Sequence, residues 1–313
     1  MFWGGEQLER NMAKLLVLLA LPALLLAGPA LRLQEDRPIV TKEMVDHINS
    51  KGLWKASLDW AGNMTVRQAR HMLGALPSAT KAPKAQLGVL HKYLQVPASF
   101  DSRDQWPGCV GAIRDQADCG SCWAFSAVEV LADRFCIDQG ITGLLLSPQW
   151  LVSCDPSNYG CGGGYLNLAW SYMQTNGVPA ESCDPYSSGD NDESGSCSAN
   201  CSQFYTATAA TSYTTPADIQ AGILQGGPVQ TAFTVYEDFY SYTSGIYTQT
   251  SDVDVGGHAV KIIGWGNQNG TNYWIVANSW GNNWGMDGFF WIAFGQCGID
   301  TDAIAGNAGQ APN

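Results

Sequence analysis

The chain has 313 residues, of which 45% are hydrophobic, so it is long enough for one large domain or two medium ones with a leader. Acidic residues number 28 against 16 basic ones, and the formal net charge is −12. This charge disfavours nucleic acid and anionic membranes as main partners, because both are negatively charged.

The N-terminus has the pattern of a secretory signal peptide. Lys14 precedes an apolar run at residues 15–26, and small residues follow at 27–30. A charge, a short apolar stretch and small residues at the cleavage point are typical of such signals, and the run is short for a membrane span. We therefore predict a signal peptide at residues 1–30, with Met12 as an alternative start, and no membrane association after its removal.

Residues 31–95 are predicted to form a separate leader segment. They are comparatively rich in Lys, Arg and His, and none of the ten cysteines lies in them. Apolar residues share one helical face in 41–51 and again in 65–73. A loose basic stretch at 77–84 then predicts a linker that proteases can reach.

From residue 96 onward the chain becomes rich in cysteines, tryptophans and glycines. Apolar side chains recur at helical spacing from 122 to 135, and short β-rich runs follow at 259–264, 273–277 and 288–293. The fold class is therefore predicted as α+β, with a helical half, a β half and a cleft between them. Cysteines in a chain that enters the secretory route are expected to be mostly disulfide-bonded.

The strongest chemical signal comes from Cys122, His258 and Asn278. Cys122 begins an amphipathic helix, where amide groups and the helix dipole favour a thiolate. His258 is the only histidine after residue 96, and its imidazolium can stabilise this thiolate and protonate a leaving amine. Asn278 can accept a hydrogen bond from the other ring nitrogen, and Trp280 can keep water from that bond.

The segment Cys-Gly-Ser-Cys-Trp at 119–123, with a histidine and an asparagine far downstream, resembles the signature of the papain family of cysteine peptidases. The likeness runs from about 97 to 306, and the segment at 297–302 is among those most similar to the cathepsin B branch. It implies a papain-like two-domain fold, with a helical left half and a β-barrel-like right half, and neither a cofactor nor a metal.

The resemblance also implies roles for individual residues. Gln116 and the Cys122 backbone amide would form the oxyanion hole, and Gly163 and Gly164 would leave an open backbone edge for a substrate strand. The S2 pocket binds the second residue before the scissile bond, P2, and its implied lining is Tyr165, Leu166, Ala259 and Asp302. The implied disulfides are Cys109–Cys136, Cys119–Cys161, Cys154–Cys197 and Cys183–Cys201, which leaves Cys122 and a buried, inert Cys297 free.

By the same resemblance, the substrates are proteins and peptides, and the enzyme is a monomer made as an inactive precursor. Residues 31–95 would be its inhibitory propeptide and 96–313 the mature domain, with residues 72–75 lying in the cleft against the substrate direction. Acid would loosen this segment, with protonation of His47 and His71 contributing. Cystatin-type inhibitors are expected partners, and the expected compartment is an acidic, lysosome-like vesicle or the extracellular space.

Other functions fit these residues less well. A redox Cys-x-x-Cys pair normally carries its Trp before the first cysteine, whereas Trp123 follows the second. A zinc site is disfavoured because Cys119, Cys122, Cys154 and Cys161 lack the paired spacing of a ribbon. A catalytically inactive papain-fold binding protein is a further alternative, although such relatives typically lack the nucleophile.

A short acidic loop favours endopeptidase activity. Cathepsin B usually carries paired histidines in an insertion that captures a terminal carboxylate, which makes it a dipeptidyl carboxypeptidase. Here residues 184–196 contain no histidine but three Asp and one Glu, which would repel a carboxylate. We therefore expect an endopeptidase with a cleft open at both ends, and keep the dipeptidyl carboxypeptidase as the alternative.

Overall fold

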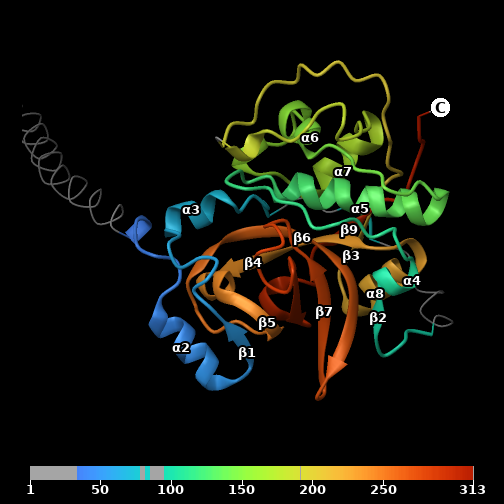
Figure 1. The fold of residues 1–313 in the computed structure, drawn as a ribbon. Coiled ribbons are helices and arrows are strands. Elements are labelled where there is room, and N and C mark those ends of the chain that lie inside the picture. The colour runs from blue at the N-terminus through green and yellow to red at the C-terminus, as the bar shows by residue number, and fades with distance from the viewer. Residues whose placement is uncertain (1–33, 78–81, 85–94, 191, 313) are drawn as a thin grey trace, which may run out of the picture.

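A computed structural model describes residues 34–77, 82–84, 95–190 and 192–312 (Figure 1). The predicted signal peptide at 1–30 and part of the predicted linker lie outside the described residues. Within the described residues, no helix is both long and apolar enough to cross a membrane.

The helical half is built around one buried helix. Helix α5 (Cys122–Gln139) is buried from its first residue to Cys136, because other elements pack around it on all sides. It ends at Gly140, whose φ of 71° is the left-handed conformation that commonly closes a helix. Helices α6 (Pro148–Cys154) and α7 (Leu166–Thr175) cover α5 on the side away from the sheet (Figure 1). Further helices are α4 (Ser102–Gln105), α8 (Pro216–Gly226), η1 (Gly160–Gly162), η2 (Ser188–Asp190), η3 (Glu237–Ser241) and η4 (Gln296–Gly298).

The other half is a curved sheet that faces α5 (Figure 1). Among the described residues its strand order is β1-β5-β8-β7-β6-β4-β9-β3, and β2 pairs with β6 off this path. The strands are β1 (Trp54–Ala56), β2 (Phe100–Asp101), β3 (Thr211–Tyr213), β4 (Val229–Tyr236), β5 (Tyr242–Tyr247), β6 (Asp254–Gln268), β7 (Thr271–Ala277), β8 (Phe289–Ala293) and β9 (Ala303–Ala305). The predicted α+β class is confirmed.

The central strand β6 brings two predicted catalytic residues together. His258 lies in β6 opposite Phe233 of β4, and β7 pairs antiparallel with β6 on the other side. Asn278 directly follows the end of β7. The register of these two strands therefore places Asn278 beside His258, although 20 residues separate them.

The N-terminal region, residues 34–77, packs against the β half. Both predicted helices are present, as α2 (Lys42–Lys51) and α3 (Val66–His71), and strand β1 extends the sheet beside β5. Two contacts fix the region near the site: the Trp60 ring stacks on Trp280 with centroids 5.4 Å apart, and the Tyr240 hydroxyl donates to the carbonyl of Ala69 at 2.7 Å.

Candidate active site

Cys122 is the first residue of α5 and is fully buried. Its Sγ accepts a hydrogen bond from the backbone N–H of Ala259 at 3.4 Å, so strand β6 touches the start of the helix here. The helix dipole and the amides of the first turn favour a negative charge at this position. Burial has the opposite and larger effect, and it raises the pKa of the Cys122 thiol to about 11. The thiol is therefore neutral near pH 7 in this form of the protein.

The tautomer of His258 follows from its hydrogen bond to Asn278. Nε2 of His258 lies 2.7 Å from Oδ1 of Asn278, and the same oxygen accepts the N–H of Ser279 at 2.8 Å. An amide oxygen can only accept, so Nε2 carries the proton and Nδ1 of the neutral ring is left as an acceptor. Nδ1 is buried without a hydrogen-bond partner among the described residues.

Burial also neutralises the imidazole. It lowers the pKa of His258 to about 4, against a smaller opposing effect of the hydrogen bond that Nε2 donates to Asn278. The Trp280 ring lies 4.6 Å from the His258 ring and is itself almost fully buried. The closed structure thus holds a neutral thiol and a neutral imidazole, and not the thiolate–imidazolium pair that the sequence predicts for the active enzyme.

Gln116 is held at both ends of its side-chain amide. Its Oε1 accepts the hydroxyl of Ser279 at 2.7 Å, and its Nε2 donates to the carbonyl of Cys119 at 2.8 Å. The same Nε2 donates to the carbonyl of Met72 at 2.9 Å. The amide therefore points into the cleft, where its N–H group already donates to a carbonyl oxygen of the N-terminal region.

Residues 71–77, called here the cleft segment, lie across Cys122. Gly164 donates its N–H to the carbonyl of Gly74 at 2.8 Å, and Leu76 donates to the carbonyl of Gly164 at 3.0 Å, which makes a parallel bridge. On the opposite wall, Ala75 donates to the carbonyl of Gly257 at 3.0 Å. The backbone of Gly74 is within hydrogen-bonding reach of the Cys122 sulfur. The segment thus bridges both walls of the cleft.

The cleft has room only for glycine at three positions, one in the cleft segment and two in the wall beside it. A Cβ at Gly74 would lie 1.7 Å from the carbonyl oxygen of Gly120. A Cβ at Gly163, whose φ is 105°, would lie 2.8 Å from the carbonyl oxygen of Gly74, and one at Gly164 would lie 2.5 Å from the Trp123 ring. Real Cβ contacts are longer, so close backbone approach requires these glycines.

One of the four predicted S2 residues lines a cavity beside the cleft segment. A cavity of about 330 Å³ beside Leu76 is lined in part by Asp302. Tyr165, Leu166 and Ala259 do not line this cavity. Leu166 is buried at the start of α7, and Tyr165 packs edge-on against Tyr159.

Cys297 also lines this cavity. It is partly exposed, so the expectation of a buried thiol is wrong, because η4 places it at the cavity wall and not in the core. Burial, followed by the nearby charge of Asp238, raises the pKa of Cys297 to about 12. This thiol is neutral at physiological pH.

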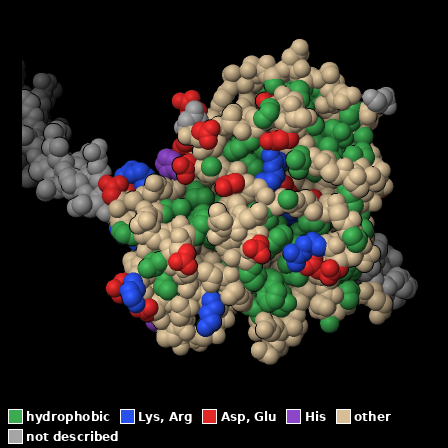
Figure 2. All heavy atoms as spheres, viewed as in Figure 1, with side chains coloured by type: hydrophobic (Ala, Val, Ile, Leu, Met, Phe, Trp, Pro, Cys, Tyr) green, Lys and Arg blue, Asp and Glu red, His purple; other side chains and the backbone are tan. Residues whose placement is uncertain are grey.

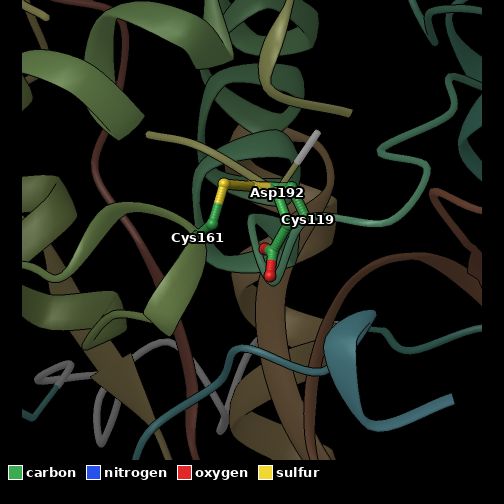
Figure 3. Close-up of side chains that lie close together, drawn as sticks. All are labelled: Cys119, Cys161 and Asp192. Atoms are coloured by element: carbon green, nitrogen blue, oxygen red, sulfur yellow. A yellow bond between two sulfur atoms is a disulfide. The ribbon is translucent and has the colours of Figure 1, made fainter. Parts of the chain in front are cut away.

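The structure contains the four disulfides that the resemblance implied: Cys109–Cys136, Cys119–Cys161, Cys154–Cys197 and Cys183–Cys201. Cys119–Cys161 joins the loop before α5 to η1, and Asp192 lies beside it (Figure 3). The two sulfurs and a carboxylate oxygen lie within 4.8 Å of one another. Because the sulfurs are bonded to each other, they offer no thiolate to a metal ion.

Asp192 forms an ion pair with His71 of the cleft segment, with Nδ1 and Oδ2 2.9 Å apart. Protonation of His71 places a positive charge against this carboxylate and strengthens the contact. The expectation that protonation of His71 helps to loosen the segment is therefore wrong in sign. Among the described residues, the other ion pair that joins the N-terminal region to the rest is Arg37–Glu237 at 2.5 Å.

Residues 96–307 match the model of the papain family of cysteine proteases. The chain belongs to the papain family. It is 38% identical to cathepsin B-like cysteine proteinase 4 of Caenorhabditis elegans, over 86% of this chain and 92% of that protein. It is 46% identical to a gut-specific cysteine proteinase of the same organism, over 68% of this chain and 74% of that protein.

Among solved structures, procathepsin B S9 of Trypanosoma congolense matches this papain-family chain with a TM-score of 0.83 and 34% identity. The match covers 88% of this chain and 100% of that one. The predicted papain-like fold and cathepsin B likeness are confirmed. Because the match is to a precursor and includes most of the N-terminal region, this protein is a cathepsin B-like proenzyme.

Sequence reasoning missed a buried ion cluster near the site. Lys261 lies three residues after His258 in β6, and its Nζ is 2.8 Å from Asp133 and 3.4 Å from Glu129, both in α5. The pairs connect α5 in the helical half to β6 in the β half. All three side chains are buried, where an unpaired charge would have a high desolvation free energy. The available signal was a lysine inside the apolar run 259–264.

Proposed function

We propose that this papain-family protein is a cysteine endopeptidase whose nucleophile is Cys122 and whose acid–base partner is His258. The strongest support is the position of the Cys122 sulfur, at the first turn of α5 and in contact with strand β6. The same strand carries His258, whose Nε2 donates to Asn278, so that Nδ1 is left as an acceptor. Departure of the cleft segment would return water to both groups. Since burial is the main reason that both are neutral, its removal allows the proton to pass from the thiol to the imidazole.

The proposed reaction is acyl transfer through a thioester. The Cys122 thiolate attacks the peptide carbonyl carbon, and the new oxyanion accepts hydrogen bonds from the Cys122 backbone amide and from Nε2 of Gln116. The His258 imidazolium gives its proton to the leaving amine as the C–N bond breaks. Water then attacks the thioester with His258 as base, which releases the carboxylic acid and regenerates the thiol. Asn278 and Trp280 keep the ring oriented and dry.

The cleft segment fits the role of an internal inhibitor. Its Met72 carbonyl accepts the hydrogen bond that Gln116 would otherwise donate to a substrate. Its backbone also pairs with that of Gly164 in the parallel direction. We propose that a substrate pairs with Gly163 and Gly164 in the opposite direction. Residues 1–30 would be removed as a signal, 31–95 would be the propeptide and 96–313 the mature monomer.

The four disulfides fit a secretory route, with an acidic vesicle or the extracellular space as the destination. Cystatin-type inhibitors are proposed as partners of the open cleft. The remaining alternative, an inactive papain-fold binding protein, predicts that the matured chain hydrolyses no peptide.

The absence of histidine from residues 184–196 makes an endopeptidase the better proposal than a dipeptidyl carboxypeptidase. Between Cys183 and Cys201 there is no Lys, Arg or His to hold a terminal carboxylate. We expect internally quenched peptides with an amidated C-terminus and with a free one to be cut at rates within about twofold of each other. The reason is that this loop has no basic side chain to attract the free carboxylate. A strong preference for the free acid, with stepwise release of dipeptides, would favour the carboxypeptidase.

Asp302 is proposed to admit arginine at P2. It lines the cavity beside Leu76, and a carboxylate there can pair with a guanidinium, although Asp reaches less far than Glu. In Asp302→Ala we expect the ratio of kcat/KM for P2 Arg to that for P2 Phe to fall about fivefold. Asp252→Ala is the matched control, because it removes an exposed charge that does not line the cavity. An unchanged ratio in Asp302→Ala shows that Asp302 does not contact P2.

A further inference from the structure

Asp192 lies at the end of the cleft opposite the Asp302 cavity. The cleft segment runs from that cavity, lined by Leu76 and Pro77, past Cys122 to the Gln116 amide, which binds the carbonyl of Met72. His71 comes next along the chain and forms the ion pair with Asp192. If the cavity binds P2, as proposed above, Asp192 faces the residues after the scissile bond, P1′ to P3′.

The loop that carries Asp192 is attached on both sides. On one side, Oε1 of Gln149 accepts the N–H of Ser188 at 3.0 Å. On the other, the hydroxyl of Ser194 accepts the N–H of Cys161 at 2.9 Å, and its carbonyl accepts Nε2 of Gln149 at 3.2 Å. The Asp192 carboxylate is thus held beside the Cys119–Cys161 disulfide (Figure 3).

A second link connects this loop to the start of α5. The Tyr186 hydroxyl bonds to Ser121 and to the carbonyl of Gln116, each at 2.8 Å. The pKa of the Tyr186 hydroxyl is raised, mainly by burial and further by the carboxylates of Asp115 and Asp192. Through the hydrogen bonds of Tyr186, this loop is attached to the start of the catalytic helix.

After maturation the protein itself has no cation to neutralise Asp192. From residue 96 onward the chain has 21 Asp and Glu but only four Lys and Arg. Each of these four has a partner elsewhere: Arg103 pairs with Asp101, Arg114 with Glu181, Arg134 with Asn307 and backbone carbonyls, and Lys261 with Asp133 and Glu129. Figure 2 shows a histidine at the surface on the left of the view, with both acidic and basic side chains beside it. In the precursor, His71 of the N-terminal region supplies a basic group beside Asp192.

We propose that Asp192 forms a primed-side subsite for a cationic side chain of the substrate, Lys, Arg or His, and that His71 occupies this subsite in the precursor. The inference rests on the proposed peptidase function and adds a substrate class to it. A carboxylate held at the cleft rim attracts a cation directly, and the acidic mature domain also steers cationic peptides toward the cleft. Because the pair is partly exposed, its contribution to kcat/KM is modest and sensitive to salt.

The test uses the matured enzyme and internally quenched peptides that carry Lys, Gln or Glu in turn at P1′, P2′ and P3′. At one of these positions we expect kcat/KM for Lys to exceed that for Gln by about two- to fivefold at low salt. The preference should vanish in Asp192→Asn, reverse toward Glu in Asp192→Lys, and persist in Glu193→Gln, which removes the neighbouring charge. Active-site titration normalises each variant, and the ratio within one variant is independent of how much of it folds.

This inference alone is overturned by a Lys to Gln ratio near one at all three positions of the wild type, or by an equal ratio in the wild type and in Asp192→Asn. Raising the salt concentration gives a second measurement on the wild type, and a Lys preference that salt leaves unchanged contradicts an ionic contact. A matured enzyme that cuts none of the peptides would instead overturn the proposed function, and this inference with it.

Discussion

Replacing Cys122 by serine is expected to reduce peptide hydrolysis by the matured enzyme at least about 10⁴-fold. The hydroxyl of serine does not ionise near neutral pH, whereas the start of α5 and the imidazole of His258 can stabilise a thiolate once the site is open. The measurement is kcat/KM on a quenched peptide, with thermal unfolding to show that the variant is folded. Because the variant cannot mature itself, a separate protease should remove its N-terminal region.

Labelling by a thiol-specific epoxide provides the control, since Cys122 and Cys297 are the free cysteines of the described chain. The label should be lost in Cys122→Ser and retained in Cys297→Ser. Substantial activity in a folded Cys122→Ser variant would show that another residue is the nucleophile.

Replacing Gly74 by valine in the full-length precursor is expected to raise its hydrolysis of a small peptide at neutral pH by about tenfold or more. The first side-chain carbon would lie 1.7 Å from the carbonyl oxygen of Gly120, so the cleft segment must move away from Cys122. Initial rates are measured while gels show the precursor to be uncut.

Leu53→Ala is the matched control for the Gly74 variant. It lies in the same N-terminal region, but its side chain is 59% exposed and outside the cleft. This variant should stay as inactive as the wild type. A folded Gly74→Val precursor that is equally inactive would mean that the cleft segment is not the block.

Local sequence patterns predicted those parts of the molecule that local physics determines. The apolar spacing of 41–51 and 65–73 predicted α2 and α3, and the cysteine before an amphipathic run predicted the start of α5. The pairing of His258 with Asn278 was predicted from residue chemistry together with the family resemblance, because spacing along the chain does not reveal that β6 and β7 are neighbours.

Features that depend on packing between distant segments could not be predicted. The stacking of Trp60 on Trp280 and the ion pair between His71 and Asp192 each join residues more than 100 positions apart. Loop residues such as Asp192 have no periodic pattern that indicates where they point. The sign of the His71 effect was mispredicted for this reason, since a histidine's response to acid depends on its partner.

The most direct test of the account is the rate at which Cys122 is alkylated by iodoacetamide at pH 7 before and after maturation, read by mass spectrometry. With a pKa of about 11, only about one Cys122 thiol in ten thousand is ionised in the closed precursor at pH 7, and the cleft segment also covers it. The account predicts negligible labelling of the precursor and rapid, selective labelling of Cys122 once the N-terminal region is gone. Equal labelling of the two forms, or a matured form labelled at Cys297 and not at Cys122, would contradict it.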